Sequence, residues 1–94
     1  MFILYVDMSV KPGSEQLLEQ TFKTVFITAI SNQEGFASAG LMRSDTTAGD
    51  YRLVLKFENQ SLQQNWVATP LHQEVWPQIE SHCASYSVQT YLSV

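Results

Sequence analysis

Phe-Ile-Leu-Tyr-Val-Asp-Met-Ser-Val, residues 2–10, is the segment from which the architecture of this 94-residue chain can be inferred. Side chains of an extended strand point alternately to its two sides. The side formed by the even-numbered positions is apolar throughout and consists of Phe2, Leu4, Val6, Met8 and Val10. The other side mixes apolar residues with Asp7 and Ser9. This period of two predicts a β-strand with one apolar face that must pack against other elements.

A helix is predicted to follow this strand. Pro12 and Gly13 break the strand, and Ser14 is a candidate N-cap. From residue 15 to about residue 32, a period of 3.6 gathers the large apolar side chains within an arc of roughly 100°. These side chains are Leu18, Phe22, Val25, Phe26 and Ala29. The segment is therefore expected to form an amphipathic helix.

The rest of the chain completes an alternating pattern of strands and helices. Residues 36–44 and 51–58 predict strands joined by the polar turn 45–50. Residues 61–68 predict a short helix, and Thr69-Pro70 starts a second one that runs to about residue 82. Residues 86–94 alternate as a fourth strand. The order β-α-β-β-α-β predicts an α+β, ferredoxin-like fold with a four-stranded antiparallel sheet, in a single domain over residues 1–94.

Two helices on one face of such a sheet leave its other face open. An apolar sheet face of this size needs a cover, and the simplest cover is a second copy of the chain packed sheet to sheet. We therefore expect a homodimer with a core that resembles a β-barrel.

Charge and composition restrict the class of partner. The net charge is −4 and the five Lys and Arg residues form no cluster, so the sequence lacks the basic surface that nucleic acids require. The first residues resemble neither a signal peptide nor a membrane span. Cys83 is the only cysteine, which favours a reducing compartment. We expect a cytoplasmic protein that binds neither nucleic acid nor membrane.

The candidate functional residues gather between residues 57 and 76. Trp66 is either a core aromatic or one wall of an aromatic-lined pocket. His72 falls within the apolar arc of its helix, where it is either a buried histidine bonded to backbone or a group that exchanges a proton near pH 7. Trp76 follows His72 by four residues and shares its helix face.

Further candidates come from the mixed side of the first strand. Asp7 lies there beside Tyr5, where a carboxylate is either exposed or serves as a polar group of a pocket. Arg43 and Arg52 are expected to be solvated or to lie at the rim of a dimer. The dispersed glycines form no phosphate-binding loop. His72 and His82 are ten residues apart on a helix interrupted by Pro77, so no metal site and no cofactor are predicted.

Four segments together resemble the antibiotic biosynthesis monooxygenase family of dimeric α+β barrels. They are Lys-Pro-Gly at residues 11–13, Glu-Gly-Phe at residues 34–36, residues 51–58, and Trp-Val-Ala-Thr-Pro-Leu-His-Gln-Glu-Val-Trp at residues 66–76. The likeness covers nearly the whole chain and implies a ferredoxin-like dimer. Members similar to this chain include cofactor-free oxygenases of anthrones or quinols, haem-degrading oxygenases, and an enzyme that processes a phosphorylated signalling sugar.

The resemblance separates these activities in part. Haem degraders of the family carry an Asn on the first strand, a Trp after the third strand and a His about ten residues later. The corresponding residues here are Asp7, Trp66 and Trp76, so His72 does not stand at the haem-ligand spacing. The family's small-Pro-any-His pattern fits residues 69–72 and implies that His72 is a pocket residue.

The leading hypothesis is a cofactor-independent monooxygenase that oxidises a small aromatic or quinol-like substrate with O₂. The expected catalytic residues are His72, which assists deprotonation, and Asp7, which orients polar substituents together with Tyr5. Trp66, Trp76 and Tyr5 are the expected substrate-binding residues. The alternatives are a non-catalytic dimer that binds a small ligand or supports a partner protein and, as a minor one, a haem-binding or haem-degrading oxygenase.

Overall fold

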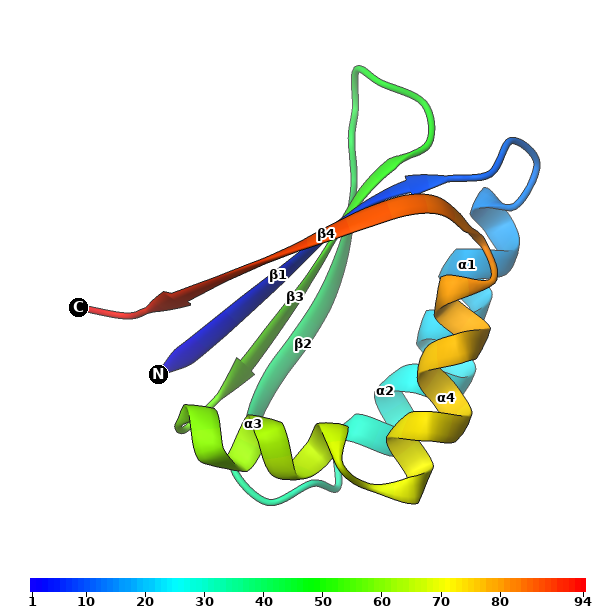
Figure 1. Ribbon diagram of the computed structural model, residues 1–94. Coiled ribbons are helices and arrows are strands. Elements are labelled where there is room, and N and C mark those ends of the chain that lie inside the picture. Colours follow the sequence, from blue (N-terminus) through cyan, green and yellow to red (C-terminus); the bar gives the residue numbers. More distant parts are fainter.

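Four antiparallel strands form one sheet in the order β2-β3-β1-β4 in the computed structural model, which describes residues 1–94 (Figure 1). The strands are β1 (Phe2–Val10), β2 (Phe36–Arg43), β3 (Asp50–Phe57) and β4 (Cys83–Leu92). β1 and β3 are the central strands and pair with each other from Phe2↔Phe57 to Ser9↔Asp50. The predicted ferredoxin-like α+β fold is confirmed.

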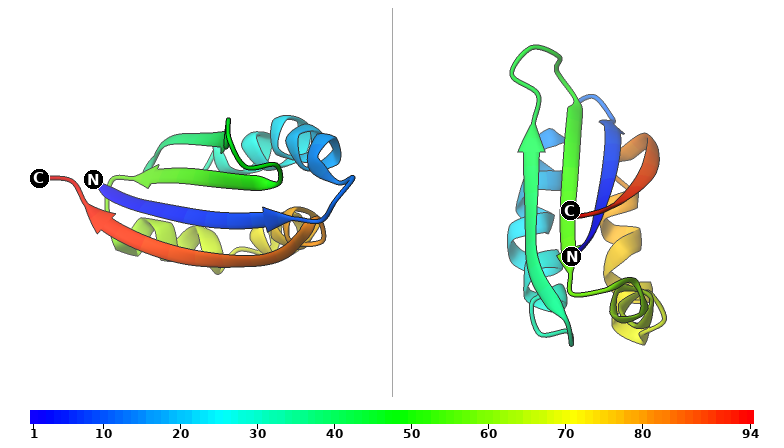
Figure 2. Two further views of the ribbon diagram at one scale, coloured as in Figure 1. Left: turned by 90° about the horizontal axis from the view of Figure 1, so that it is seen from above. Right: turned by 90° about the vertical axis from the view of Figure 1, so that its left-hand side faces the viewer.

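The helices all lie on one face of the sheet (Figures 1 and 2). They are α1 (Glu15–Thr21), the π-helix η1 (Phe22–Phe26), α2 (Ile27–Ile30), α3 (Gln60–Val67) and α4 (Pro70–Glu80). The predicted helix 15–32 is therefore continuous in direction but is widened by one π-helical segment and ends at Ile30. None of the helices has the length and apolar character that spanning a bilayer requires.

The boundary between α4 and β4 differs from the prediction. The helix ends at Glu80 and the strand begins at Cys83, three residues before the predicted start. The reason is a long-range contact: Cys83 pairs with Val10 at the end of β1, and the Lys11 amide donates to the His82 carbonyl at 2.9 Å. Pairing with β1 thus satisfies backbone groups that local periodicity assigned to the helix.

The hydrophobic core lies between the sheet and the helices. The even-numbered side of β1, which the sequence identified as apolar, faces this core, and Val6 and Met8 are each 3% exposed. Leu53 and Phe57 of β3 meet Leu18 and further helix residues there. The helices of the same chain therefore cover the apolar face of β1, and the face left open is the mixed one.

The open face of the sheet carries a connected set of polar and aromatic groups. The register places Tyr5 of β1 opposite Val54 of β3 and Gln89 of β4. Tyr5 also contacts the ring of Tyr91, with centroids 5.3 Å apart, and the Arg52 guanidinium lies 4.8 Å from the centre of the Tyr5 ring. This face is thus a mixture of aromatic, aliphatic and paired charged side chains.

Candidate functional site

An apolar cavity of about 190 Å³ lies between the sheet and helices α3 and α4. Ten of its twelve lining residues are hydrophobic and come from β1, β3, β4, η1, α3 and α4. The two others are Gln63 and His72. Tyr86 and Val88, which are 41% and 52% exposed, also line it, so the cavity reaches solvent along β4. A small, mostly apolar cavity with few polar groups is typical of a ligand site.

The turn between α3 and α4 fixes the relative positions of the cavity's aromatic residues. The Thr69 hydroxyl donates to the carbonyl of Trp66 at 2.7 Å and accepts from the amide of His72 at 3.1 Å. Thr69 is therefore the N-cap of α4, as predicted, and it also binds the end of α3. This one side chain connects the helix that carries Trp66 to the helix that carries His72.

Aromatic rings surround the His72 imidazole. The ring stands edge-on to the Trp66 indole, with centroids 5.1 Å apart, and nearly parallel to the Trp76 indole at 6.4 Å. Trp66 packs in turn against Phe26 of η1 at 6.3 Å, and Trp76 packs against Tyr86 of β4 at 5.4 Å. The histidine is thus held in an aromatic environment, where a positive charge is poorly solvated.

Burial lowers the pKa of His72 below its ordinary value of 6.5, which favours the neutral imidazole. The Gln73 amide nitrogen lies 2.9 Å from the Val67 carbonyl, which can only accept, and 3.4 Å from His72 Nδ1. An amide nitrogen only donates, so this contact is a hydrogen bond in the tautomer that carries the ring proton on Nε2. In that tautomer the neutral imidazole offers an N–H donor at Nε2, which has no partner in the protein.

The structure brings together three of the five predicted site residues: Trp66, His72 and Trp76 all line the cavity. Asp7 and Tyr5 lie on the open face, on the opposite side of the sheet. Asp7 is paired there with Arg52, at 2.6 Å from Nε and 3.2 Å from Nη2. Side chains alternate along β1, and its even-numbered positions face the helices and the cavity. The odd-numbered Tyr5 and Asp7 therefore point away from Trp66, His72 and Trp76.

A broader hollow of about 590 Å³ has Asp7 in its lining and lies at the end of the sheet formed by residues 7–9, 42–44, 50–52 and 85–87. It is lined mainly by polar residues, among them Arg52, Ser85 and Ser87. In the single chain, Asp7 and His72 therefore line different depressions, and Tyr86 borders both.

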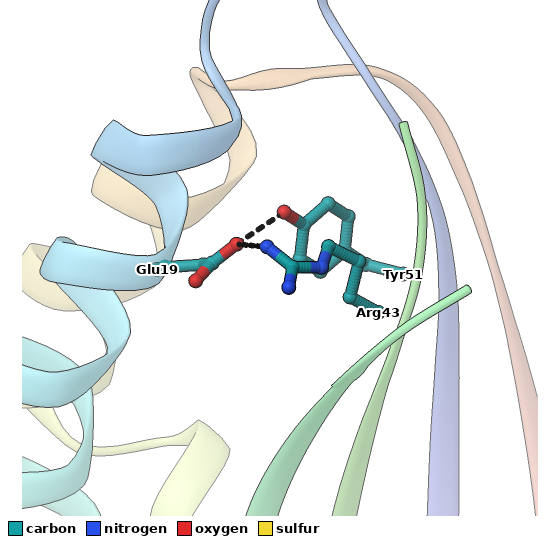
Figure 3. Close-up of polar contacts among 3 residues, drawn as sticks. All are labelled: Glu19, Arg43 and Tyr51. Carbon is teal, nitrogen blue, oxygen red and sulfur yellow. Dashed lines mark hydrogen bonds and ion pairs between the residues drawn. The ribbon is translucent and has the colours of Figure 1, made fainter. Parts of the chain in front are cut away.

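A second polar cluster, not predicted from the sequence, ties α1 to the sheet (Figure 3). The Tyr51 hydroxyl and the Arg43 guanidinium both donate to Glu19 Oε2, the latter at 3.2 Å. The hydrogen bond from Tyr51, with a smaller contribution from Arg43, lowers the pKa of Glu19. Burial and then the Glu19 carboxylate raise the pKa of Tyr51. The three residues lie outside the apolar cavity and fasten the first helix to β2 and β3.

Sequence reasoning also missed Gln63, the only buried polar residue of the chain. Its spacing from Trp66 contained the signal, because residues three apart on a helix share a face. No group of three or more His, Cys, Asp or Glu side chains is placed to hold a metal ion.

Comparison with known proteins identifies the family of this fold. The family model described as antibiotic biosynthesis monooxygenase matches residues 1–77. No curated protein matches the sequence.

Solved structures share the fold at low identity. A candidate antibiotic biosynthesis monooxygenase from Bordetella bronchiseptica is 20% identical with a TM-score of 0.87, over 99% of this chain and 97% of that one. One from Caulobacter crescentus is 16% identical with a TM-score of 0.87, over 99% and 89%. SnoaB from Streptomyces nogalater, a cofactor-independent oxygenase, is 13% identical with a TM-score of 0.84, over 98% and 92%.

Proposed function

Because the chain belongs to the antibiotic biosynthesis monooxygenase family, we propose that its apolar cavity is the active site of a cofactor-independent monooxygenase that oxidises a small quinol-like aromatic with O₂. The observation that carries the proposal is the placement of His72 between Trp66 and Trp76 in a cavity that is otherwise almost wholly apolar. SnoaB, a fold neighbour, is a cofactor-independent oxygenase, which supports this choice among the family's activities.

The size of the cavity supports a small substrate. An apolar protein cavity of about 150 Å³ takes up benzene, and the cavity here measures about 190 Å³. A single substituted ring fits this volume, with room for ring substituents toward the solvent-accessible side at Tyr86 and Val88. The indoles of Trp66 and Trp76 supply flat apolar surfaces against which such a ring can pack.

His72 assists ionisation of the substrate by stabilising the anion. The substrate hydroxyl gives its proton to water at the open side of the cavity, and the Nε2–H of neutral His72 donates a hydrogen bond to the oxygen that becomes negative. In an apolar surrounding this hydrogen bond is stronger than in water, which favours the electron-rich anion. The contact of the Gln73 amide with Nδ1 favours the tautomer that donates from Nε2.

The oxidation balances without an external reductant. For a hydroquinone, one oxygen atom of O₂ forms a bond to a ring carbon and the other leaves as water, which gives a hydroxyquinone. The ring supplies all the electrons, and its two hydroxyl protons and one ring proton are redistributed between water and the new hydroxyl group. The protein's part is to bind the anion, to exclude bulk water and to hold the ring in place.

The assembly proposed for this function is a homodimer formed through the open sheet face. This face exposes Tyr91, which is 51% exposed, and Met42, which is also 51% exposed, beside the half-buried Tyr5 and Val54. Asp7 and Tyr5 would then lie at the interface. The catalytic role of Asp7 and the substrate-binding role of Tyr5 stay predictions. Neither residue takes part in the proposed reaction.

Oxygen uptake tests the proposed activity directly. Wild-type protein is mixed with monocyclic hydroquinones and with anthrone in an oxygen electrode, and uptake without protein is subtracted as autoxidation. We expect uptake above this background that His72→Phe lowers by roughly a hundredfold or more, because the hydrogen bond to the anion is lost. The control is His82→Phe, because His82 lies outside the cavity. Retention of the compounds without oxygen uptake would instead support the non-catalytic ligand-binding alternative.

A further inference from the structure

Gln63 stands out among the polar side chains of the protein. It is 8% exposed and is the only buried polar or charged residue of the chain. It lines the apolar cavity and none of the other four pockets of the molecule. An amide that lines an apolar cavity is available to a ligand when no protein group binds it.

The Gln63 amide makes no hydrogen bond within the protein. Among the other helix glutamines, Gln73 donates to the Val67 carbonyl at 2.9 Å and Gln78 donates to the Glu74 carbonyl at 3.2 Å. The helix glutamines without such a bond, Gln16, Gln20, Gln60 and Gln64, are exposed to solvent, whereas Gln63 is buried. Every fully buried side-chain nitrogen or oxygen atom of the protein has a partner. The amide atoms of Gln63 are therefore the part of this residue that remains accessible, and the cavity is the space it lines.

We propose that Gln63 is the residue that selects substrates with a second oxygen substituent, which its amide binds while His72 binds the first. This inference rests on the proposed function and assigns a specificity residue to the second oxygen atom of its quinol-like substrate. An amide donates and accepts, so it matches either a hydroxyl group or a carbonyl group. Because it is neutral, it brings this selectivity into the apolar cavity without a charge to solvate.

The helix geometry directs the bound ring. Gln63 shares a face of α3 with Trp66, three residues on, and with Val67, four residues on, and all three line the cavity. A ring whose oxygen is bound by Gln63 therefore lies against the Trp66 indole. His72 stands edge-on to the same indole and lines the same cavity, so the proposal assigns to it another oxygen of that ring.

Binding of two isosteric probes tests the role of Gln63. Hydroquinone and p-xylene have the same shape but differ in having two hydroxyl groups or none. Their dissociation constants are measured by equilibrium dialysis under nitrogen for wild-type protein and for Gln63→Met, which keeps the side-chain length. We expect Gln63→Met to weaken hydroquinone binding about threefold to tenfold, the effect of one neutral hydrogen bond, and to leave p-xylene binding unchanged or tighter.

Controls separate this effect from a change in folding. Gln64→Met alters the next residue of the same helix, which is exposed, and should change neither constant. Gln63→Asn, which retracts the amide, should weaken hydroquinone binding and spare p-xylene. Retained p-xylene binding shows that the cavity is intact in each variant.

Three results would overturn the inference: equal losses for both probes, no loss for hydroquinone in Gln63→Met, or no measurable hydroquinone binding by wild-type protein. The assay needs no oxygen chemistry, so its outcome is separate from that of the oxygen-uptake experiment. A protein that consumes no oxygen but loses hydroquinone affinity in Gln63→Met would refute the oxygenase and retain the binding role.

Discussion

The imidazole of His72 stands edge-on to the indole of Trp66, with 5.1 Å between the ring centroids, although the two residues belong to different helices. Thr69 holds this pair together, because its hydroxyl binds the backbone of both residues. Both rings line the apolar cavity. His72 is thus a titratable group in a position where its charged form is unfavourable.

The stability of the protein is therefore expected to depend on the ionisation of His72. Burial lowers the pKa of His72, so between that lowered value and 6.5 the unfolded state binds more protons than the folded state. The contribution of this group to the free energy of unfolding is complete above about pH 6.5 and is lost as the pH falls to the folded-state pKa. Urea unfolding between pH 4.5 and pH 8 measures it.

Substitution identifies the group responsible. His72→Phe should flatten the dependence in this window relative to wild-type protein, because the variant has no group to titrate at this site. His82→Phe, outside the cavity, should leave the His72-dependent part in place. Identical pH profiles for wild-type protein and His72→Phe would show that burial of His72 has no effect on its ionisation.

The hydrogen bond from Tyr51 to Glu19 is expected to stabilise the packing of α1. Its acceptor is charged and Tyr51 is 4% exposed, so Tyr51→Phe should lower the free energy of unfolding by roughly 1–3 kcal/mol at pH 7. Arg43→Ala should cost less than about 1 kcal/mol, because the ion pair with Glu19 is largely exposed. Denaturant unfolding of Tyr51→Phe, Glu19→Gln and the double variant measures the coupling.

Glu19 gives the stability a second pH dependence, which has a different cause: its charged form is stabilised by a hydrogen bond, whereas the charged form of His72 is disfavoured by burial. The pKa of Glu19 is lowered from 4.5, so its contribution is present above that value and declines as the pH falls through the lowered pKa. The cost of Tyr51→Phe should therefore be smaller at pH 3 than at pH 7. An equal cost at both values would mean that the charge of Glu19 does not strengthen the bond.

Gly35 is expected to tolerate no side chain. Its φ of +78° belongs to the left-handed region, and an added Cβ would overlap Leu62 Cδ1 and lie 2.8 Å from Leu62 Cβ. Leu62 cannot easily move, because its amide is held by the Asn59 side chain at the start of α3. Backbone strain and overpacking together should make Gly35→Ala destabilising by roughly 2–5 kcal/mol in thermal or denaturant unfolding.

Two other glycines separate these causes. Gly13 has a φ of +86° but no atom within 4 Å of an added Cβ, so Gly13→Ala should cost only the strain, roughly 1–2 kcal/mol. Gly40→Ala has neither problem within the chain, and because Gly40 lies beside Val54 on the open sheet face, any loss of stability there reports on the proposed dimer interface. Equal losses for Gly35→Ala and Gly13→Ala would show that Leu62 moves aside at no cost.

The open sheet face is expected to mediate dimerisation. Val54 lies near the middle of this face, between Tyr5 and Gly40 on the neighbouring strands. Val54→Lys should shift the mass measured by light scattering at micromolar concentration from dimer toward monomer, because an interface would bury the charge unpaired. Leu17→Lys, at a residue 54% exposed on α1, is the control and should remain dimeric. A monomeric wild-type protein would contradict the proposed assembly.

The order of the elements follows from local patterns in the chain. The period of two in residues 2–10 and the helical arc from Leu18 to Ala29 reflect which side of each element meets the core, and a single segment displays that pattern by itself. Thr69-Pro70 likewise determines the start of α4, since an N-cap and a proline at the first helical position act on their own backbone. The same local spacing put His72 and Trp76 on one helix face.

Contacts between distant segments decided the rest. The pairing of β1 with β3 placed Asp7 beside Arg52, 45 residues away, and no local pattern contains that contact. Tyr51 donates a hydrogen bond to Glu19, 32 residues away, only because α1 packs over β3. The unpaired amide of Gln63 became visible only when every neighbour was in place. Periodicity shows which residues are buried, but a functional site depends on which of them meet, and packing of the whole chain decides that.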